Sequence, residues 1–260
     1  MLNNIYKLLS ILAFCAFSIT IVSANTATTN IDETNNTNTT SKEKVAKINN
    51  KDNKPREVIV YEFNFSKQTD GTADKWFIKE KFEENRDGED IIKTFKQGKL
   101  YLEAKEELVG FWSKRLSIKN ANKIRITWGV DKFPQISNWE QDIRRSGLSI
   151  AISFGDKEQP SGSWVVPNVP YFISLFIDNS ALENKPYIGS YWQNSARYVC
   201  IACNVDTGER IISEFNLTQQ FKEYFQQDTV PYISSITFDV DTRDTDGISS
   251  VFVEKIEFIQ

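Results

Sequence analysis

The fold of this chain is decided by stretches such as Ile236-Thr-Phe-Asp-Val-Asp-Thr-Arg-Asp-Thr-Asp-Gly247. Ile236, Phe238 and Val240 recur with a period of two, which is the spacing of side chains on one face of a β-strand. The polar residues between them share the opposite face. The acidic end of the stretch, closed by a glycine, has the composition of a turn. The stretch therefore predicts a half-buried strand that runs into an acidic turn.

Short runs rich in aromatic and β-branched residues predict seven further strands, at residues 58–65, 100–104, 124–130, 148–154, 171–177, 198–204 and 251–258. In one of them the small residues Ser149, Ala151 and Ser153 alternate with large apolar ones, which predicts a shallow open face. The helical spacing of apolar residues within 216–227 predicts one short helix. Many strands and one helix predict an all-β fold, a two-sheet antiparallel β-sandwich of the jelly-roll type.

Residues 1–24 have the organisation of a secretory signal peptide. Lys7 precedes an apolar run (residues 8–22), and small residues lead to a predicted cleavage after Ala24. Two alternatives are a lipid attached at Cys15 and an uncleaved anchor, although the run is shorter than the roughly 17 to 25 residues of a spanning helix. After cleavage no transmembrane segment is expected. The leader predicts a periplasmic or secreted protein.

Composition then divides the chain into two parts. Residues 25–55 are rich in Asn, Thr and Lys and contain almost no large apolar side chains, so we expect a disordered linker. Residues 56–260 carry the aromatic and β-branched runs. About two hundred residues can bury one sizeable core without help from metal or disulfides. We therefore expect a single β-sandwich domain over residues 56–260.

Charge and histidine content narrow the function classes. The formal net charge is -4 and no Lys/Arg block is present, so the chain lacks the basic surface that nucleic acid requires. The chain has no histidine, which excludes Ser-His-Asp and Cys-His nucleophile systems and His-ligated zinc. Its eleven glycines are dispersed and form no phosphate loop. No catalytic residue is therefore assigned from a motif.

A family resemblance is carried by three motifs, which are Lys-Ile-Arg-Ile-Thr-Trp-Gly-Val-Asp-Lys-Phe-Pro at 123–134, Asp142 ahead of a strand ending in Phe154, and Asp239-Val-Asp-Thr242 before the closing strand. In this order they resemble the bacterial domain-of-unknown-function 3047 family, over most of residues 61–258. The resemblance implies an exported envelope protein with a galactose-binding-like sandwich and no settled activity. The chain departs from the family at residues 143–147 and at Cys200-Ile-Ala-Cys203.

The acidic turn has two interpretations, both centred on its four carboxylates, Asp239, Asp241, Asp244 and Asp246. Calcium takes six to eight oxygen ligands, and these residues offer several from one short segment, although their spacing is not that of an EF-hand. Alternatively, Asp244 and Asp246 make turns before Gly247 while Arg243 pairs with a neighbouring acid. Calcium is the one cofactor the sequence suggests, and none is required for folding.

Cys200 and Cys203 form a C-x-x-C within a predicted strand. Residues i and i+3 of a regular strand point to opposite faces, so the two sulfurs meet only across a bulge or turn. The favoured interpretation is a pair of buried structural thiols, since cysteine behaves as a small apolar residue. A disulfide is the alternative. A redox role is disfavoured because redox C-x-x-C pairs open a helix.

Aromatic residues in predicted loops suggest a ligand-binding surface, whose proposed members are Trp139, Asp142, Trp164, Tyr191, Trp192 and Gln193. Exposed indole rings stack on the apolar face of sugars, while acid and amide groups bond the hydroxyls. The alternative is that each ring simply closes one end of the core, because large aromatic side chains are mostly buried.

Three functions follow from these observations. The first is a non-catalytic binding module for a carbohydrate or envelope glycan. The second is a glycan hydrolase or lyase that uses paired carboxylates, with Asp142 and either Asp239 or Asp241 as the pair. The third is a structural envelope protein without a ligand. The absence of a catalytic motif favours the first, and the sequence leaves the oligomeric state open.

Overall fold

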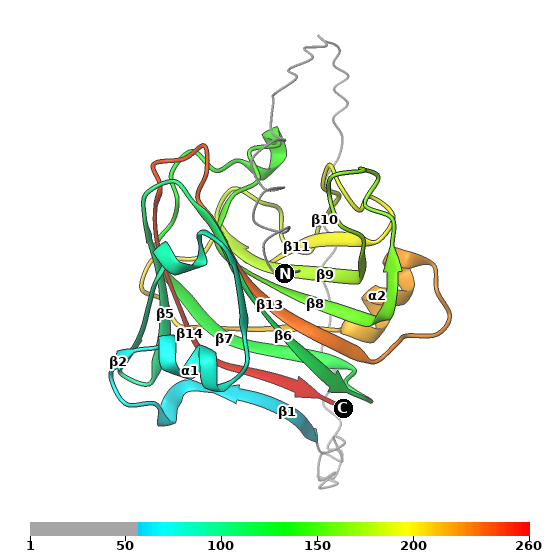
Figure 1. Ribbon diagram of the computed structural model, residues 1–260, viewed down its shortest axis with the longest axis horizontal. Helices are drawn as coiled ribbons and strands as arrows, with labels where there is room; N and C mark the ends of the chain where they lie inside the picture. Colours follow the sequence, from blue (N-terminus) through cyan, green and yellow to red (C-terminus); the bar gives the residue numbers. More distant parts are fainter. Residues whose placement is uncertain (1–56) are drawn as a thin grey trace, which may run out of the picture. The chain divides into compact units, whose positions relative to one another are not determined.

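The computed structural model describes residues 57–260, and Glu57–Gln260 form one compact unit (Figure 1). The predicted signal peptide, residues 1–24, and the predicted linker, residues 25–55, lie outside the described residues. Within the described residues, no helix is sufficiently long and apolar to cross a membrane.

Two seven-stranded sheets make up the domain. Sheet A contains β1 (Ile59–Asn64), β2 (Gly71–Thr72), β4 (Ile92–Lys96), β5 (Lys99–Lys105), β7 (Lys123–Lys132), β12 (Ile211–Phe215) and β14 (Ile248–Ile259). Sheet B contains β3 (Glu83–Arg86), β6 (Val109–Ile118), β8 (Ser146–Gln159), β9 (Val169–Asp178), β10 (Pro186–Tyr187), β11 (Ala196–Cys203) and β13 (Ile233–Asp241). Short 3-10 turns occur at Phe65–Lys67, Asp87–Asp90 and Trp139–Gln141.

The strand order is that of a jelly roll. Sheet A contains the run β5-β14-β7-β12 and sheet B the run β6-β13-β8-β9, so the chain crosses repeatedly between the sheets and its last strands insert between earlier ones. This confirms the predicted two-sheet β-sandwich. One pairing differs from the antiparallel expectation, because β11 lies parallel to β9. Figure 1 shows β11, β9, β8 and β13 side by side in sheet B.

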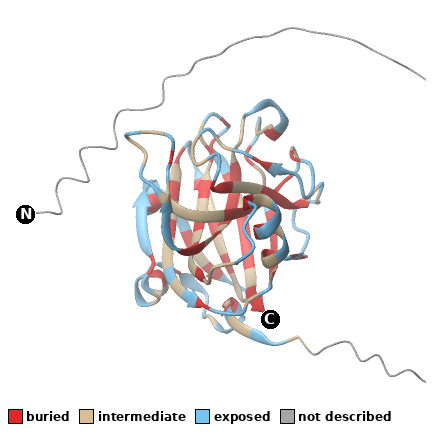
Figure 2. Cartoon of the chain, turned by 90° about the vertical axis from the view of Figure 1, so that its right-hand side faces the viewer, coloured by how far each residue is buried: buried red, intermediate tan, exposed pale blue. Residues whose placement is uncertain are grey.

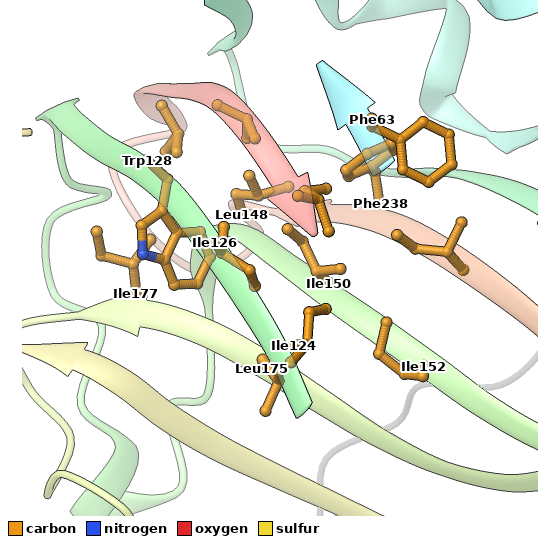
Figure 3. Packing of buried hydrophobic residues seen from close by; sticks show 14 of the residues in the cluster. Phe63, Ile124, Ile126, Trp128, Leu148, Ile150, Ile152, Leu175, Ile177 and Phe238 are labelled. Atoms are coloured by element: carbon orange, nitrogen blue, oxygen red, sulfur yellow. The ribbon is translucent and has the colours of Figure 1, made fainter. Parts of the chain in front are cut away.

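The core lies between the sheets and consists of the alternating apolar residues predicted from the sequence. Ile124, Ile126 and Trp128 of β7 face Leu148 and Ile150 of β8, and all five are fully buried (Figure 3). Figure 2 shows that buried residues concentrate in the strands, whereas exposed residues lie mainly in the connections. Because side chains alternate along a strand, the residues between these core positions form the outer face of each sheet.

The predicted helix is α2 (Leu217–Phe225). Asn216 caps its start, since the Asn216 side-chain oxygen accepts a hydrogen bond from the Gln219 backbone N–H at 2.9 Å. Leu217, Phe221 and Phe225 are buried against the core. A second and shorter helix, α1 (Asp74–Lys79), was not expected from the sequence. Its buried residue is Phe77, whose ring lies 5.4 Å from that of Trp112.

Cys200 and Cys203 form a disulfide, so the favoured interpretation as structural thiols is wrong. The physical reason is a bulge in β11, where the register with β9 shifts between Cys200 and Ala202. An extra residue reverses the alternation of faces, so that residues i and i+3 are brought to the same side. Their Cα atoms lie 6.1 Å apart. The sequence did not reveal the bulge.

Candidate functional site

Small, mostly polar side chains cover the central strands of sheet B on its outer face. Thr237 of β13 lies between Ser113 of β6 and Ala151 of β8, and Ala151 in turn pairs with Ser174 of β9. The hydroxyls of Ser113 and Thr237 are 2.8 Å apart. Most of these side chains are short and several carry hydroxyl groups, and Ser149 and Ser174 are themselves buried. The alternation around Ser149 predicted a shallow face here. We call it the open face of sheet B.

A row of aromatic side chains borders the open face. Ring centroids are separated by 6.1 Å between Tyr191 and Trp192, by 5.8 Å between Trp192 and Phe172, and by 5.8 Å between Phe172 and Tyr198. Tyr198 lies 6.2 Å from Trp139. We call these five residues the aromatic row. The row begins in the loop before β11, passes over β9 and β11, and ends in the loop between β7 and β8.

Trp139 does not present its ring to solvent, so the expectation of an exposed platform there is wrong. The residue is 4% exposed, and its ring stacks on Phe176 at 3.8 Å. Its indole N–H donates to the Arg145 carbonyl at 3.2 Å. Phe176 lies on the outer side of sheet B, and it is fully buried because Trp139 covers it. Trp139 therefore anchors the β7–β8 connection onto the sheet.

The structure does bring Trp164, Tyr191 and Trp192 into one region. The backbone N–H of Trp192 donates to the Ser161 carbonyl at 3.0 Å, and the Trp192 indole N–H donates to the Pro167 carbonyl at 2.9 Å. These bonds tie residues 160–168, which carry Trp164, to residues 188–195. We call the two segments the rim loops.

Within the rim loops, Trp164 is 94% exposed, whereas Tyr191 and Trp192 are half-buried and Gln193 is exposed. The loop that carries Trp164 is fixed from inside, because the Ser161 hydroxyl is buried and donates to the Val166 carbonyl at 2.7 Å. The exposed indole is thus held on an ordered turn.

Asp142 lies in the β7–β8 connection, outside the rim loops. It has a positive φ of 62°, its side chain is exposed, and it pairs with Arg144. The Arg144 guanidinium also donates to the carbonyl of Ile188, at the edge of the rim loops. Asp142 therefore reaches the predicted site only through Arg144, which the sequence did not single out.

The acidic passage does not converge on one point. Asp241 accepts two hydrogen bonds from the Arg243 guanidinium, at 3.0 and 2.6 Å, and Asp244 pairs with Arg145. Asp246 accepts from the Ile248 backbone N–H at 3.3 Å, as a turn-forming aspartate does. Among residues 57–260, no group of three or more acidic or cysteine side chains is arranged to hold a metal ion. The geometry is that of the alternative interpretation, a turn with ion pairs.

Asp239 differs from the other three acids. It points onto the open face opposite Ser149, whose hydroxyl donates to Asp239 Oδ2 at 3.4 Å. The other oxygen, Oδ1, is buried and has no hydrogen-bond partner. Burial, and then the negative charge of Asp241, raise the pKa of Asp239 to about 7. A buried carboxylate with an unpaired oxygen lowers the stability of the fold. Asp239 is therefore a stronger indication of a functional site than the acidic turn.

Tyr198 and Arg144 complete the surroundings of Asp239. Burial is the main cause of the raised pKa of the Tyr198 phenol; the charges of Asp239 and Asp241 raise it further, and that of Arg144 lowers it. All three charges therefore act on one hydroxyl. The Nε atom of Arg144 is buried and without a partner, like Asp239 Oδ1. Sequence reasoning missed Tyr198 and Phe172, although the alternation of their strands placed both on the outer face.

A separate hollow of about 540 Å³ lies at the end of the sandwich near α2. Asn122, Phe154, Lys222 and Tyr232 are among its lining residues. None of the predicted site residues lines it, so the hollow and the open face of sheet B are distinct features of the surface.

Comparison with known proteins adds little to this geometry. No protein-family model matches the chain, and no curated protein matches it either. A similar solved structure is a glycoside hydrolase domain, Endo-D from Streptococcus pneumoniae R6, with 8% identity and a TM-score of 0.32. The match covers 69% of this chain and 21% of that structure. A likeness of this strength carries no argument about activity, and the resemblance to the domain-of-unknown-function 3047 family stays a prediction.

Proposed function

We propose that this protein is a non-catalytic module that binds a carbohydrate chain along the rim loops and the open face of sheet B. The observation that carries the proposal is the exposed indole of Trp164 on an ordered loop beside Tyr191 and Trp192. A large apolar ring held in water gains free energy when a partner covers it. The apolar face of a pyranose is such a partner, and loops on a rigid sandwich are a frequent place for this contact.

The polar residues of the surface suit a neutral, hydroxyl-rich ligand. Gln193 lies exposed on the rim loops, and the hydroxyls of Ser113 and Thr237 lie on the open face. An open face bordered by a row of rings accommodates a chain rather than a single enclosed sugar. Export to the periplasm or the exterior, which rests on the predicted signal peptide, would bring the protein to envelope glycans.

The test is retention of the purified chain on an array of polysaccharides, followed by affinity measurements with Trp164→Ala. We expect the substitution to weaken binding about 5- to 30-fold, because stacking on one ring contributes about 1–2 kcal/mol. Ile78→Ala is the matched control, since Ile78 is 75% exposed on α1 and lies outside the site. Equal affinity of both variants, or no retained polysaccharide, would refute the proposal.

Glycan hydrolysis is the second candidate, and one observation favours it. Burial raises the pKa of Asp239 to about 7, and the neighbouring Asp241 pairs with Arg145 and Arg243. Acid–base hydrolysis of a glycoside uses two carboxylates in different environments. If the purified chain releases reducing ends from a polysaccharide, and Asp239→Asn abolishes this release, the hydrolase proposal would replace the binding-module proposal. Asp142 is exposed and pairs with Arg144, so Asp241 replaces it as the favoured second carboxylate.

A further inference from the structure

We propose that Asp239, Arg144 and Tyr198 form a polar subsite, next to the aromatic row, that binds the hydroxyl groups of one neutral sugar unit through the ionised carboxylate of Asp239. This inference rests on the proposed function and locates where the sugar hydroxyls would be recognised. It assigns to Asp239 a role in direct ligand binding rather than in metal binding.

The first support is the unsatisfied hydrogen-bonding capacity of the subsite. Asp239 Oδ1 is a buried acceptor without a donor, and Arg144 Nε is a buried donor without an acceptor. A buried polar group without a partner is unfavourable for the fold. A sugar hydroxyl both donates and accepts, so hydroxyl groups can satisfy both atoms. Few other neutral groups offer both functions at one atom.

The second support is the position of Tyr198. Its ring belongs to the aromatic row, and the ring centroid lies 5.8 Å from that of Phe172. The charges of Asp239, Asp241 and Arg144 all affect the pKa of its phenol. One side chain therefore connects the apolar border of the open face with its polar part. A sugar unit has the same two-sided character, with an apolar ring face and hydroxyls around the rim.

The charges around Asp239 determine which form binds and which ligand is excluded. Asp241 and Arg243 on β13 and its turn, and Arg86 on β3, act on Asp239, whose charge acts on Tyr198 of β11. Of the two arginines before β8, Arg144 acts on Tyr198 and Arg145 contacts Asp241. Arg145 and Arg243 already pair with Asp241, and Arg144 with Asp142. An ionised Asp239 would repel the charge of an acidic sugar, and the guanidinium groups of Arg144, Arg145 and Arg243 already pair with acids of this protein. The subsite therefore suits neutral units.

The carboxylate accepts a stronger hydrogen bond than the carboxylic acid does, so binding favours the ionised form. Burial and Asp241 raise the pKa of Asp239 to about 7, so most of the protein is protonated there at pH 5.5 and ionised at pH 8.5. From these populations, affinity for a neutral sugar should rise with pH, by up to about 30-fold across this interval.

The experiment measures the affinity of the purified full chain for neutral hexasaccharides of glucose, galactose and N-acetylglucosamine between pH 5.5 and 8.5. For the unaltered protein we expect at least a ten-fold rise with pH. Asp239→Asn should bind weakly with little dependence on pH. Asp131→Asn is the matched control, since Asp131 is an exposed acid on β7 of the other sheet, and it should follow the unaltered protein.

Tyr198→Phe keeps the ring and removes the hydroxyl, so it decides the question if Asp239→Asn does not fold. It should lower affinity several-fold while the dependence on pH persists. Hexasaccharide binding that is sensitive to Trp164→Ala, but independent of pH and of both subsite variants, would overturn this inference and leave the proposed function intact. Failure of every hexasaccharide to bind the unaltered protein would remove both.

Discussion

The two sheets carry charged residues on their outer faces in opposite ways. On sheet A, Lys123 and Arg125 of β7 lie between Glu57 and Glu214, and each cation contacts both acids. Hydrogen bonds from Lys123 and then Arg125 lower the pKa of Glu57 to about 2. On sheet B, the central strands carry small hydroxyl side chains together with Asp241, which is paired with arginines, and Asp239, one of whose oxygens has no partner.

The difference separates a surface built for stability from one that gives up stability. A paired and solvated charge costs the fold little, and a network of pairs is mildly favourable. A carboxylate that is buried without a full set of donors is unfavourable in its ionised form. Since both faces belong to one sandwich, the sheet architecture does not impose this cost on sheet B. The proposed ligand binding would account for this cost.

The largest expected effect is on the free energy of unfolding, and it compares a buried with an exposed tryptophan on the outer side of sheet B. Trp139→Ala should lower the free energy of unfolding by about 3–5 kcal/mol, because it removes a buried ring stacked on Phe176. Trp164→Ala should leave it within about 0.5 kcal/mol, since that ring is exposed. Chemical denaturation of both variants measures the contrast. Similar values would show that the two tryptophans do not differ in packing.

The next effect concerns the cost of Asp239. Its folded pKa of about 7 lies above the ordinary value of 3.8, so the folded state binds the extra proton between these values. Stability should therefore fall as pH rises from about 4 to 7 and stay lower above that, by at most about 4 kcal/mol. Asp239→Asn should remove this loss and be the more stable protein at pH 8.

Thermal unfolding of the unaltered protein and Asp239→Asn at pH 4.5 and pH 8 checks the sign. The difference between them should be small at pH 4.5 and favour the asparagine variant at pH 8. Asp131→Asn, on the outer side of sheet A, should show no comparable change with pH. An asparagine variant that is less stable at pH 8 would mean that the ionised Asp239 is well solvated or paired.

The smallest effect belongs to the paired charges of sheet A. Arg125→Ala should lower the melting temperature by no more than about 3 °C, because Lys123 remains beside Glu57 and Glu214. Arg210→Ala, which breaks a single pair with Glu254, serves as the control and should have a smaller effect. Both effects should shrink in 1 M salt. A loss as large as that of Trp139→Ala would contradict the stated contrast between the faces.

Periodicity predicted much of the fold and part of the site. The alternation of Leu148, Ile150 and Ile152 with small residues predicted both the core side and the open side of β8. The helical spacing of Leu217, Phe221 and Phe225 located α2. The bulge that joins Cys200 to Cys203 was not predictable, because a register shift depends on the neighbouring strand.

The site shows the same division at the level of single rings. Trp139 and Trp164 have similar settings in the sequence, each in a polar connection, yet one is 4% and the other 94% exposed. What separates them is whether a ring of another strand lies underneath, and Phe176 lies under Trp139. The same holds for Asp239 and Asp241, which lie two residues apart on β13. Arg243 donates a hydrogen bond to Asp241, whereas Asp239 Oδ1 has no donor.

The sequence by itself determined that this chain folds as stacked β-sheets without imidazole chemistry, because side-chain alternation and composition are local properties. Only the tertiary structure decided which aromatic rings remain in water and which carboxylate lacks a partner. Those outcomes depend on residues distant in the sequence, brought together by strand order and register, and no local pattern contains that information.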